Sequence, residues 1–288
     1  MSLKYILWGL LIGSTSLKAQ MPKTDVYLVA FDNLWQEPKI KQISFLNHFN
    51  LDGYNNQARF VDDEVYLTVA NDPNGKTDIY ALNPSQATYY YVTQTKGISE
   101  FSAIPYQKSF ATVRIEANEK DQSLWLYPKD RSHYGKRLFP NINNIGYFDW
   151  IDDQQVALFL VGKPHQLAIG QIHTSEIQIV TENIGRCLKS AKNGLLYFVD
   201  KSQSDVWYLK TYDTVEKTIQ NVAPMPKGTE DFDIYNHYVV AAQGSKLLMW
   251  NLKSNTEWQL LSDFGPYHIT NINRPHVSLN KILFVNNK

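Results

Sequence analysis

Short hydrophobic runs separated by turn residues recur along the chain, and the pattern is clearest between residues 55 and 91. β-Branched and aromatic residues fill four runs in this stretch, whereas Gly, Pro, Asn and Asp fill the intervals. The runs cover Gln57–Val61, Glu64–Ala70, Thr77–Leu82 and Thr88–Thr93. These two residue classes favour strands and turns, respectively. Four successive strands joined by short turns are typical of one blade of a β-propeller.

The same unit recurs along the rest of the chain. Four-strand units are predicted at 101–139, 147–181, 186–222 and 231–261, and only two strands at each end, at 24–45 and 272–286. One position of the third strand marks the repeat, at Tyr27, Tyr80, Trp125, Ala168, Trp207 and Leu248. The gaps between these residues are 53, 45, 43, 39 and 41 positions. A period near 40–45 residues with four strands per unit is the signature of a propeller.

The number of strands predicts how the ring closes. Five complete blades leave two strands at each end of the chain. We expect the C-terminal pair to supply the first and second strands of a sixth blade, and the N-terminal pair to supply its third and fourth. This closure removes the exposed sheet edges that an open array would have. The predicted fold is therefore an all-β, six-bladed β-propeller of four-stranded antiparallel blades.

Composition fits one large globular domain over residues 20–288. Hydrophobic residues make up 43% of the 288 positions and charged residues 19%, which excludes a disordered chain. The formal net charge is zero and no basic run occurs, so nucleic acid is not expected as a partner. Cys187 is the only cysteine, so no intrachain disulfide can form.

The first 19 residues are predicted to be an export signal. Lys4 gives a positive start, 5–13 is an apolar segment too short for a stable membrane span, and Ala19 precedes a cleavage site at Gln20. The alternative is an uncleaved anchor helix. No later segment is long and apolar enough to cross a membrane. We therefore expect a periplasmic or secreted protein that does not span the membrane after cleavage and is a monomer.

Candidate binding residues come from the start of each innermost strand, because these starts surround the central channel of a propeller. We counted four residues back from the apolar residue before each first turn, and also took the next position. Eight of the polar residues found in this way are taken as candidates: Asn56, Glu100, Tyr147, Arg186, Glu230, Asp231, Asn273 and Arg274. Arg186 and Arg274 are suited to a carboxylate or phosphate, since a guanidinium matches two oxygens. The alternative is that these are ordinary polar loop residues around a water-filled channel.

The repeats resemble those of the TolB-like family of propellers. The resemblance rests on three stretches, 57–63 (Gln-Ala-Arg-Phe-Val-Asp-Asp), 77–80 (Thr-Asp-Ile-Tyr) and 146–152 (Gly-Tyr-Phe-Asp-Trp-Ile-Asp). The family usually has Pro-x-Phe-Ser-Pro-Asp-Gly at the first turn, and every blade here departs from that motif. The resemblance covers residues 24–288 and implies an exported, non-enzymatic interaction module, without naming its ligand.

Two classes of function therefore remain open. The first is a non-catalytic propeller that binds a protein, peptide or cell-envelope component at its channel. The second is a carbohydrate-active or lactonase-type enzyme, in which Glu100, Glu230 and Asp231 would supply paired carboxylates. No Gly-x-Ser-x-Gly elbow and no histidine or cysteine pattern for a metal occurs. We assign no catalytic residue, and expect neither a metal nor another cofactor.

Overall fold

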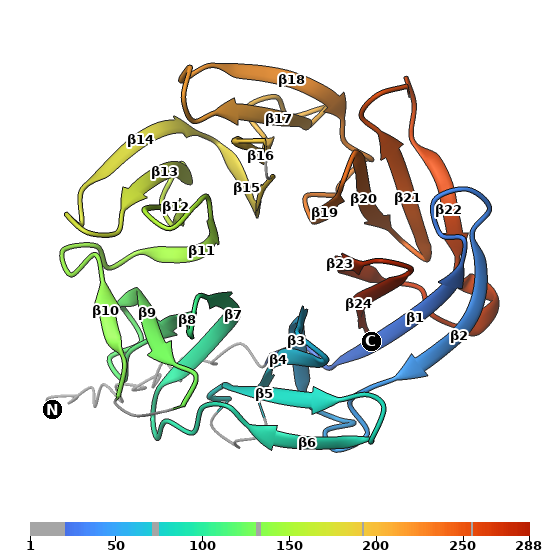
Figure 1. Cartoon of the computed structure of the whole chain (residues 1–288), viewed down its shortest axis with the longest axis horizontal. Helices are drawn as coiled ribbons and strands as arrows, with labels where there is room; N and C mark the ends of the chain where they lie inside the picture. Colours follow the sequence, from blue (N-terminus) through green and yellow to red (C-terminus); the bar gives the residue numbers. More distant parts are fainter. Residues whose placement is uncertain (1–20, 71–74, 131–133, 192, 255) are drawn as a thin grey trace, which may run out of the picture.

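Six antiparallel sheets of four strands each form a ring around a central axis (Figure 1). The computed structural model of the chain describes residues 21–70, 75–130, 134–191, 193–254 and 256–288. The predicted signal segment lies outside the described residues. Apart from strands, one short 3₁₀ helix is found among them, η1 (Gly265–Tyr267). The all-β, six-bladed propeller predicted from the strand pattern is therefore confirmed.

Five blades each use four consecutive strands, counted from the channel outward. Blade 1 contains β3 (Tyr54–Val61), β4 (Glu64–Ala70), β5 (Asp78–Asn83) and β6 (Thr88–Tyr91). Blade 2 contains β7 (Ser99–Tyr106), β8 (Ser109–Ile115), β9 (Gln122–Pro128) and β10 (Lys136–Leu138). Blade 3 contains β11 (Ile145–Trp150), β12 (Gln155–Leu160), β13 (Gln166–Gln171) and β14 (Ile177–Glu182). Blade 4 contains β15 (Ile184–Ser190), β16 (Leu195–Asp200), β17 (Tyr208–Asp213) and β18 (Ile219–Pro224). Blade 5 contains β19 (Phe232–Tyr235), β20 (Tyr238–Gln243), β21 (Lys246–Asn251) and β22 (Gln259–Asp263).

Blade 6 is built from both ends of the chain, as the strand count predicted. From the channel outward it contains β23 (Ile272–Ser278), β24 (Lys281–Asn287), β1 (Thr24–Asp32) and β2 (Lys39–Phe45). β1 and β24 pair without a register shift from Thr24 opposite Asn287 to Ala30 opposite Lys281. This pairing joins the first strand to the last and closes the ring.

The core lies between the blades. In the described part of the chain, buried hydrophobic residues form six clusters, and each cluster joins two neighbouring blades. The second strands are buried on both faces for this reason: all residues of β4 after Glu64 are buried. Such strands read as continuous hydrophobic runs and not as alternating ones.

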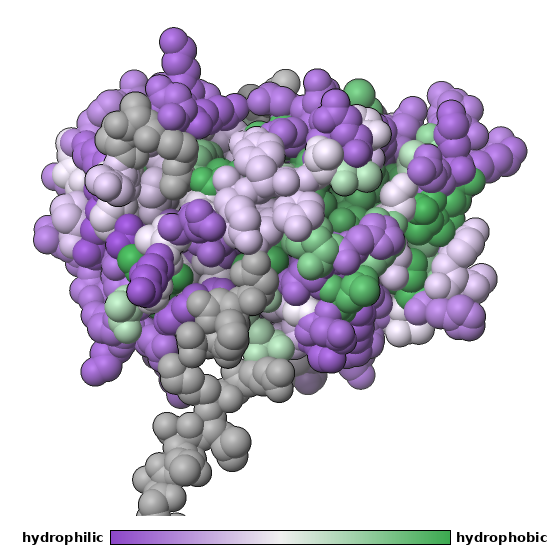
Figure 2. All heavy atoms as spheres, turned by 90° about the horizontal axis from the view of Figure 1, so that it is seen from below, coloured by the Kyte–Doolittle hydropathy of each residue, from purple (hydrophilic) through white to green (hydrophobic). Residues whose placement is uncertain are grey.

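The outer strands meet solvent instead. All four residues of β6 are exposed, and the view onto this side of the ring shows a mostly hydrophilic surface with hydrophobic residues gathered toward the right (Figure 2). No helix of the described residues is long and apolar enough to cross a membrane.

Phe284 on β24 is the side chain by which the closing blade can be tested. It is fully buried and contacts the rings of Tyr27 on β1 and Phe264, with centroid distances of 5.8 and 5.0 Å. We expect Phe284→Ala to lower the free energy of unfolding by about 3–5 kcal/mol, because it leaves a cavity at the junction of the two chain ends. Urea denaturation measures this loss. Leu279→Ala is the control, since Leu279 is 69% exposed and should change stability by no more than about 0.5 kcal/mol. Equal effects of the two substitutions would contradict the prediction.

Candidate functional site

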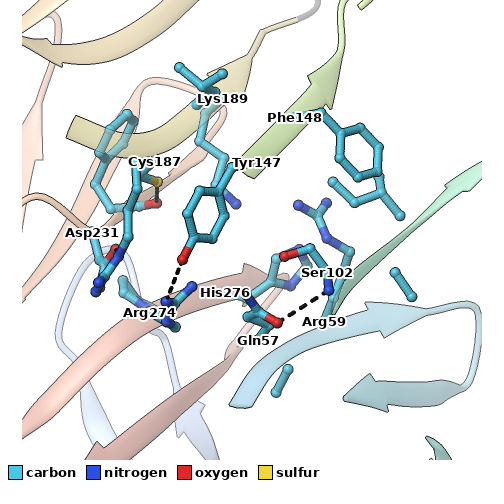
Figure 3. Close-up of a pocket in the computed structure, with 17 residues that line it drawn as sticks. Gln57, Arg59, Ser102, Tyr147, Phe148, Cys187, Lys189, Asp231, Arg274 and His276 are labelled. Atoms are coloured by element: carbon cyan, nitrogen blue, oxygen red, sulfur yellow. Dashed lines mark hydrogen bonds and ion pairs between the residues drawn. The ribbon is translucent and has the colours of Figure 1, made fainter. Parts of the chain in front are cut away.

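The innermost strands of all six blades meet around a cavity of about 90 Å³ on the axis of the ring (Figure 3). A second cavity of about 220 Å³ adjoins it, because Arg186 and Asp231 line both. The walls are rich in charged and polar side chains. These two cavities form the candidate site.

Irregular backbone brings three polar side chains to the central cavity. The pairing of β3, β7 and β23 with the second strands shifts register at Gln57, Ser102 and Arg274. Each of these residues lies four positions before the end of its strand and has a positive φ, of 53°, 56° and 51° respectively. Non-glycine residues adopt such φ values only at a cost. A β-bulge of this kind re-aims side chains, and all three residues line the cavity.

The Asp231 carboxylate accepts three hydrogen bonds. The Arg186 guanidinium donates to both of its oxygens, from Nε at 2.9 Å and from Nη2 at 2.6 Å. The backbone N–H of Arg274 also donates to this carboxylate. Burial alone would raise the pKa of Asp231, but the Arg186 hydrogen bond and the charges of both arginines lower it below the ordinary value. Asp231 is therefore ionised at neutral pH, and the guanidinium fork of Arg186 is already occupied.

Arg274 has a different environment. Its Nη2 donates to the Tyr147 hydroxyl at 3.1 Å, and its guanidinium carbon lies 5.4 Å from the centre of the Tyr147 ring (Figure 3). In the described ranges, no carboxylate lies within ion-pair distance of the Arg274 side chain. A guanidinium carries five N–H donors, so most of the donors of Arg274 remain available to a ligand.

A second layer of the channel contains one residue from each innermost strand. In every blade it lies two positions before the last residue that pairs with the second strand. The six residues are Arg59, Ile104, Asp149, Lys189, Asp233 and His276. Lys189 Nζ lies 2.8 Å from Asp233, and a guanidinium nitrogen of Arg59 lies 3.9 Å from Asp149. Most of this layer is therefore charged and paired within the channel.

Three members of this layer also join neighbouring innermost strands. Asp149 accepts the backbone N–H of Ser190 at 2.8 Å, and Asp233 accepts that of Val277 at 2.7 Å. His276 Nδ1 accepts the N–H of Phe60 at 3.4 Å. Burial lowers the pKa of His276 well below its ordinary value, so the ring is neutral at pH 7 and its nitrogen can accept.

The structure separates the eight residues predicted for the channel ring into three groups. Tyr147, Arg186, Asp231 and Arg274 line the central cavity. Glu230 and Asn273 line the adjoining cavity. Asn56 and Glu100 line neither of the two. That any of the eight contacts a ligand remains a prediction.

Asn56 and Glu100 have bonds within the fold. The Asn56 side-chain oxygen accepts the N–H of Gln57 at 2.8 Å and supports the bulge of β3. Glu100 is fully buried and accepts the Tyr127 hydroxyl at 2.7 Å and the Thr95 hydroxyl at 3.3 Å. Both side chains stabilise the backbone beside the channel.

The count reached Gln57, which was not taken as a candidate, and it missed Arg59, Ser102 and Lys189; all four line the central cavity. The count took only the positions four and three residues before the apolar residue at each first turn, and Arg59, Ser102 and Lys189 lie closer to the turn than that. If the blades had been aligned at the turn between their first and second strands, Arg59 and Lys189 would have fallen at the same position.

Glu230 is held at the mouth of the site. Its Oε2 accepts Lys201 Nζ at 3.1 Å, and the Lys201 ammonium lies 4.0 Å from the centre of the Trp207 ring. The described residues contain no group of three or more His, Cys, Asp and Glu side chains that could hold a metal ion.

Comparison with solved structures bears directly on this arrangement. A structure assigned as TolB from Agrobacterium tumefaciens matches with a TM-score of 0.69 and 8% identity, over 93% of this chain and 99% of the other. The fold is that of a TolB-like six-bladed β-propeller. A chain of a nidogen/laminin complex matches with a TM-score of 0.62 and 10% identity, over 82% of this chain and 92% of the other.

The matched structures also include an enzyme. An oligogalacturonate lyase from Vibrio parahaemolyticus matches with a TM-score of 0.50 and 13% identity, over 92% of this chain and 98% of the other. No family model matches the sequence, and neither does any curated protein. At these identities the likeness defines the fold, and the function has to be argued from the site.

The Arg186–Asp231 pair predicts a pH-dependent contribution to stability. At neutral pH, Asp231→Asn should lower the free energy of unfolding by about 2–3 kcal/mol, because it removes the nearest counter-charge of the half-buried Arg186 and leaves only Glu230, at 3.7 Å. The folded pKa of Asp231 is lowered, so its contribution is full above the unfolded pKa of about 3.9. It is lost as the pH falls through the folded pKa.

Denaturant unfolding of the wild type and Asp231→Asn at several pH values between 7 and 2 should therefore show a difference that shrinks below about pH 4. Asp62→Asn, at the exposed turn after β3, is the control and should show a small difference at every pH. A constant difference between wild type and Asp231→Asn would rule out this account of the pair.

Proposed function

We propose that the chain is an exported, non-catalytic propeller that binds a protein, peptide or other cell-envelope component at its central channel. The observation that carries the proposal is the Arg274 guanidinium, which lines the cavity and is bonded to only one hydroxyl among the described side chains. A cation with open donors inside a polar cavity is a recognition element for an anionic or hydrogen-bonding ligand.

The relatives in fold support a binding role. One of the matched chains comes from a structure described as a nidogen/laminin complex, and another is assigned as TolB. The first shows that a propeller of similar shape occurs in a complex between proteins. We extend this role to the present chain because its channel offers a polar site and a wider adjoining cavity.

The carbohydrate-active or lactonase alternative has less support from the site. Glu100 is buried beside Tyr127 and lines neither cavity, and Asp231 is held by Arg186. Of the three carboxylates considered for such chemistry, Glu230 and Asp231 adjoin each other in sequence and lie on the same side of the channel. Glycoside cleavage instead needs two carboxyl groups on opposite sides of the bond.

Capture experiments test the binding proposal. A tagged chain of residues 20–288 should retain a partner from its own cell envelope, and Arg274→Gln and Glu230→Gln should lose most of it. Lys253→Gln, on an exposed turn of blade 5, is the matched control and should retain the partner. Mass spectrometry identifies what is captured, and thermal unfolding checks that each variant folds. Retention by all variants would place the binding site outside the channel, and recovery of a glycan would favour the enzyme alternative.

The export part of the proposal rests on residues 1–19. We expect signal removal between Ala19 and Gln20 in a cell that makes the protein, because a small residue precedes the cut and the apolar segment is too short to anchor. Intact-mass measurement of the purified protein, with fractionation of periplasm and medium, tests this. Protein that keeps its first 19 residues and sediments with membranes would support the anchor alternative.

A further inference from the structure

The charges around the channel do not cancel. Four cations line the central cavity: Arg59, Arg186, Lys189 and Arg274. Three carboxylates accompany them, Asp149, Asp231 and Asp233, and each is buried. His276 is neutral, and the Glu230–Lys201 pair at the mouth is balanced. With all three carboxylates ionised, one positive charge is in excess, and the raised pKa of Asp149, caused by its burial, does not reduce that excess.

The excess charge is located at Arg274. Arg186 is paired with Asp231, Lys189 with Asp233, and Arg59 lies 3.9 Å from Asp149. Only Arg274 of the four has no ion-pair partner in the described ranges. A charge in a poorly hydrated site is costly unless an opposite charge accompanies it. The site therefore favours a ligand group that carries one negative charge.

A second hydrogen-bond donor, the Gln57 side chain, lies with Arg274 on the cavity wall. The Gln57 side-chain oxygen accepts from Thr68 Oγ1 at 2.7 Å and from Ser102 N at 3.2 Å. Gln57 lines the cavity, where its bond to Ser102 is visible (Figure 3), and its NH₂ group donates to no partner among the described residues. A singly charged carboxylate has two oxygens, which suit a guanidinium and an amide donor. A phosphate monoester carries about −1.5 to −2 charges at pH 7 and exceeds the single positive charge.

The sizes of the two cavities indicate what kind of ligand carries the negatively charged group. The central cavity of about 90 Å³ is much smaller than the roughly 300–1,000 Å³ of pockets that hold a whole small ligand. It can take one end of a ligand. The adjoining cavity of about 220 Å³ is lined by Glu230, Asn273 and the Lys227–Thr229 turn. Its polar groups can bond to the amides of an extended chain.

We infer that the channel binds the terminal carboxylate of an extended peptide, with the carboxylate on Arg274 and the preceding residues in the adjoining cavity. This inference rests on the proposed function and specifies the chemistry of its ligand. A free small carboxylate would share the first contact but not the second.

The probes are N-acetyl-trialanine with a free carboxyl group, the same peptide as its C-terminal amide, sodium acetate and inorganic phosphate. Calorimetric titration at constant ionic strength should show the free acid binding about ten- to hundredfold more tightly than the amide, because a charge-assisted bond is lost. Acetate should bind more weakly than the free-acid peptide, and should therefore compete with it only at a higher concentration. Phosphate should compete no better than acetate.

Arg274→Gln is the informative variant. Gln57 has the same position and nearly the same positive φ on β3, so glutamine is compatible with this backbone. The variant should remove the preference for the free acid over the amide, whereas Lys253→Gln should keep it. The comparison of acid with amide on the wild type stands even if Arg274→Gln does not fold.

The outcomes separate this inference from the broader proposal. Equal binding of acid and amide overturns the carboxylate inference, as does stronger competition by phosphate. Acetate competing as well as the peptide shows a free carboxylate as the ligand and overturns the peptide part. Failure of all probes to bind overturns the inference as a whole, and envelope capture then decides on its own whether the channel binds another partner.

Discussion

Packing between neighbouring blades is the constraint on which this structure depends. Each blade is a four-stranded sheet whose middle strands are buried on both faces, so its hydrophobic residues are covered only when a blade lies on either side. A row of such sheets would leave two uncovered faces, and a ring leaves none. The shared sixth blade, in which β1 pairs with β24, provides this closure and makes the stability of every blade depend on both ends of the chain.

The same geometry creates the candidate site. Around the axis the innermost strands surround a small cavity, and the space between them holds polar groups that bond across blades. Asp149, Asp233 and His276 each accept a backbone N–H from the next blade and thereby fix the strands around the channel. The bulges at Gln57, Ser102 and Arg274 then turn other side chains into the remaining space. The bonds that fix the strands and the side chains of the candidate site thus lie in two adjacent layers of one channel.

Sequence patterns predicted the fold better than the site, for a physical reason. Blade number and closure follow from how often hydrophobic runs and turns recur, and such counts tolerate errors of one or two residues. Side-chain direction in a strand reverses with every residue, so one bulge moves a predicted channel residue away from it. An offset of one residue has the same effect, as at Glu100: its count began at Ile104, which aligns with Arg59 and not with Phe60, and its side chain lies beside Tyr127. Arg274 was predicted because it lies three residues before the apolar residue at the turn, a position that the count included. Arg59 and Lys189 lie closer to the turn, at a position that it did not include. The pairing of Arg186 with Asp231 depends on contacts between blades, which a single sequence does not contain.

The shared blade also means that the ring cannot close until the last strand has been synthesised. Tyr27 on β1 pairs with Phe284 on β24, which the ribosome adds about 250 residues later. At roughly 5–20 residues per second, the N-terminal strand is made about 13–50 s before its partner exists. Throughout that interval β1 presents an unpaired edge and the hydrophobic side chains of Val26 and Val29, which the finished ring covers completely. Chaperones that hold nascent chains would act on this edge, and the speed of translation would affect how much of the protein reaches the closed ring before it aggregates.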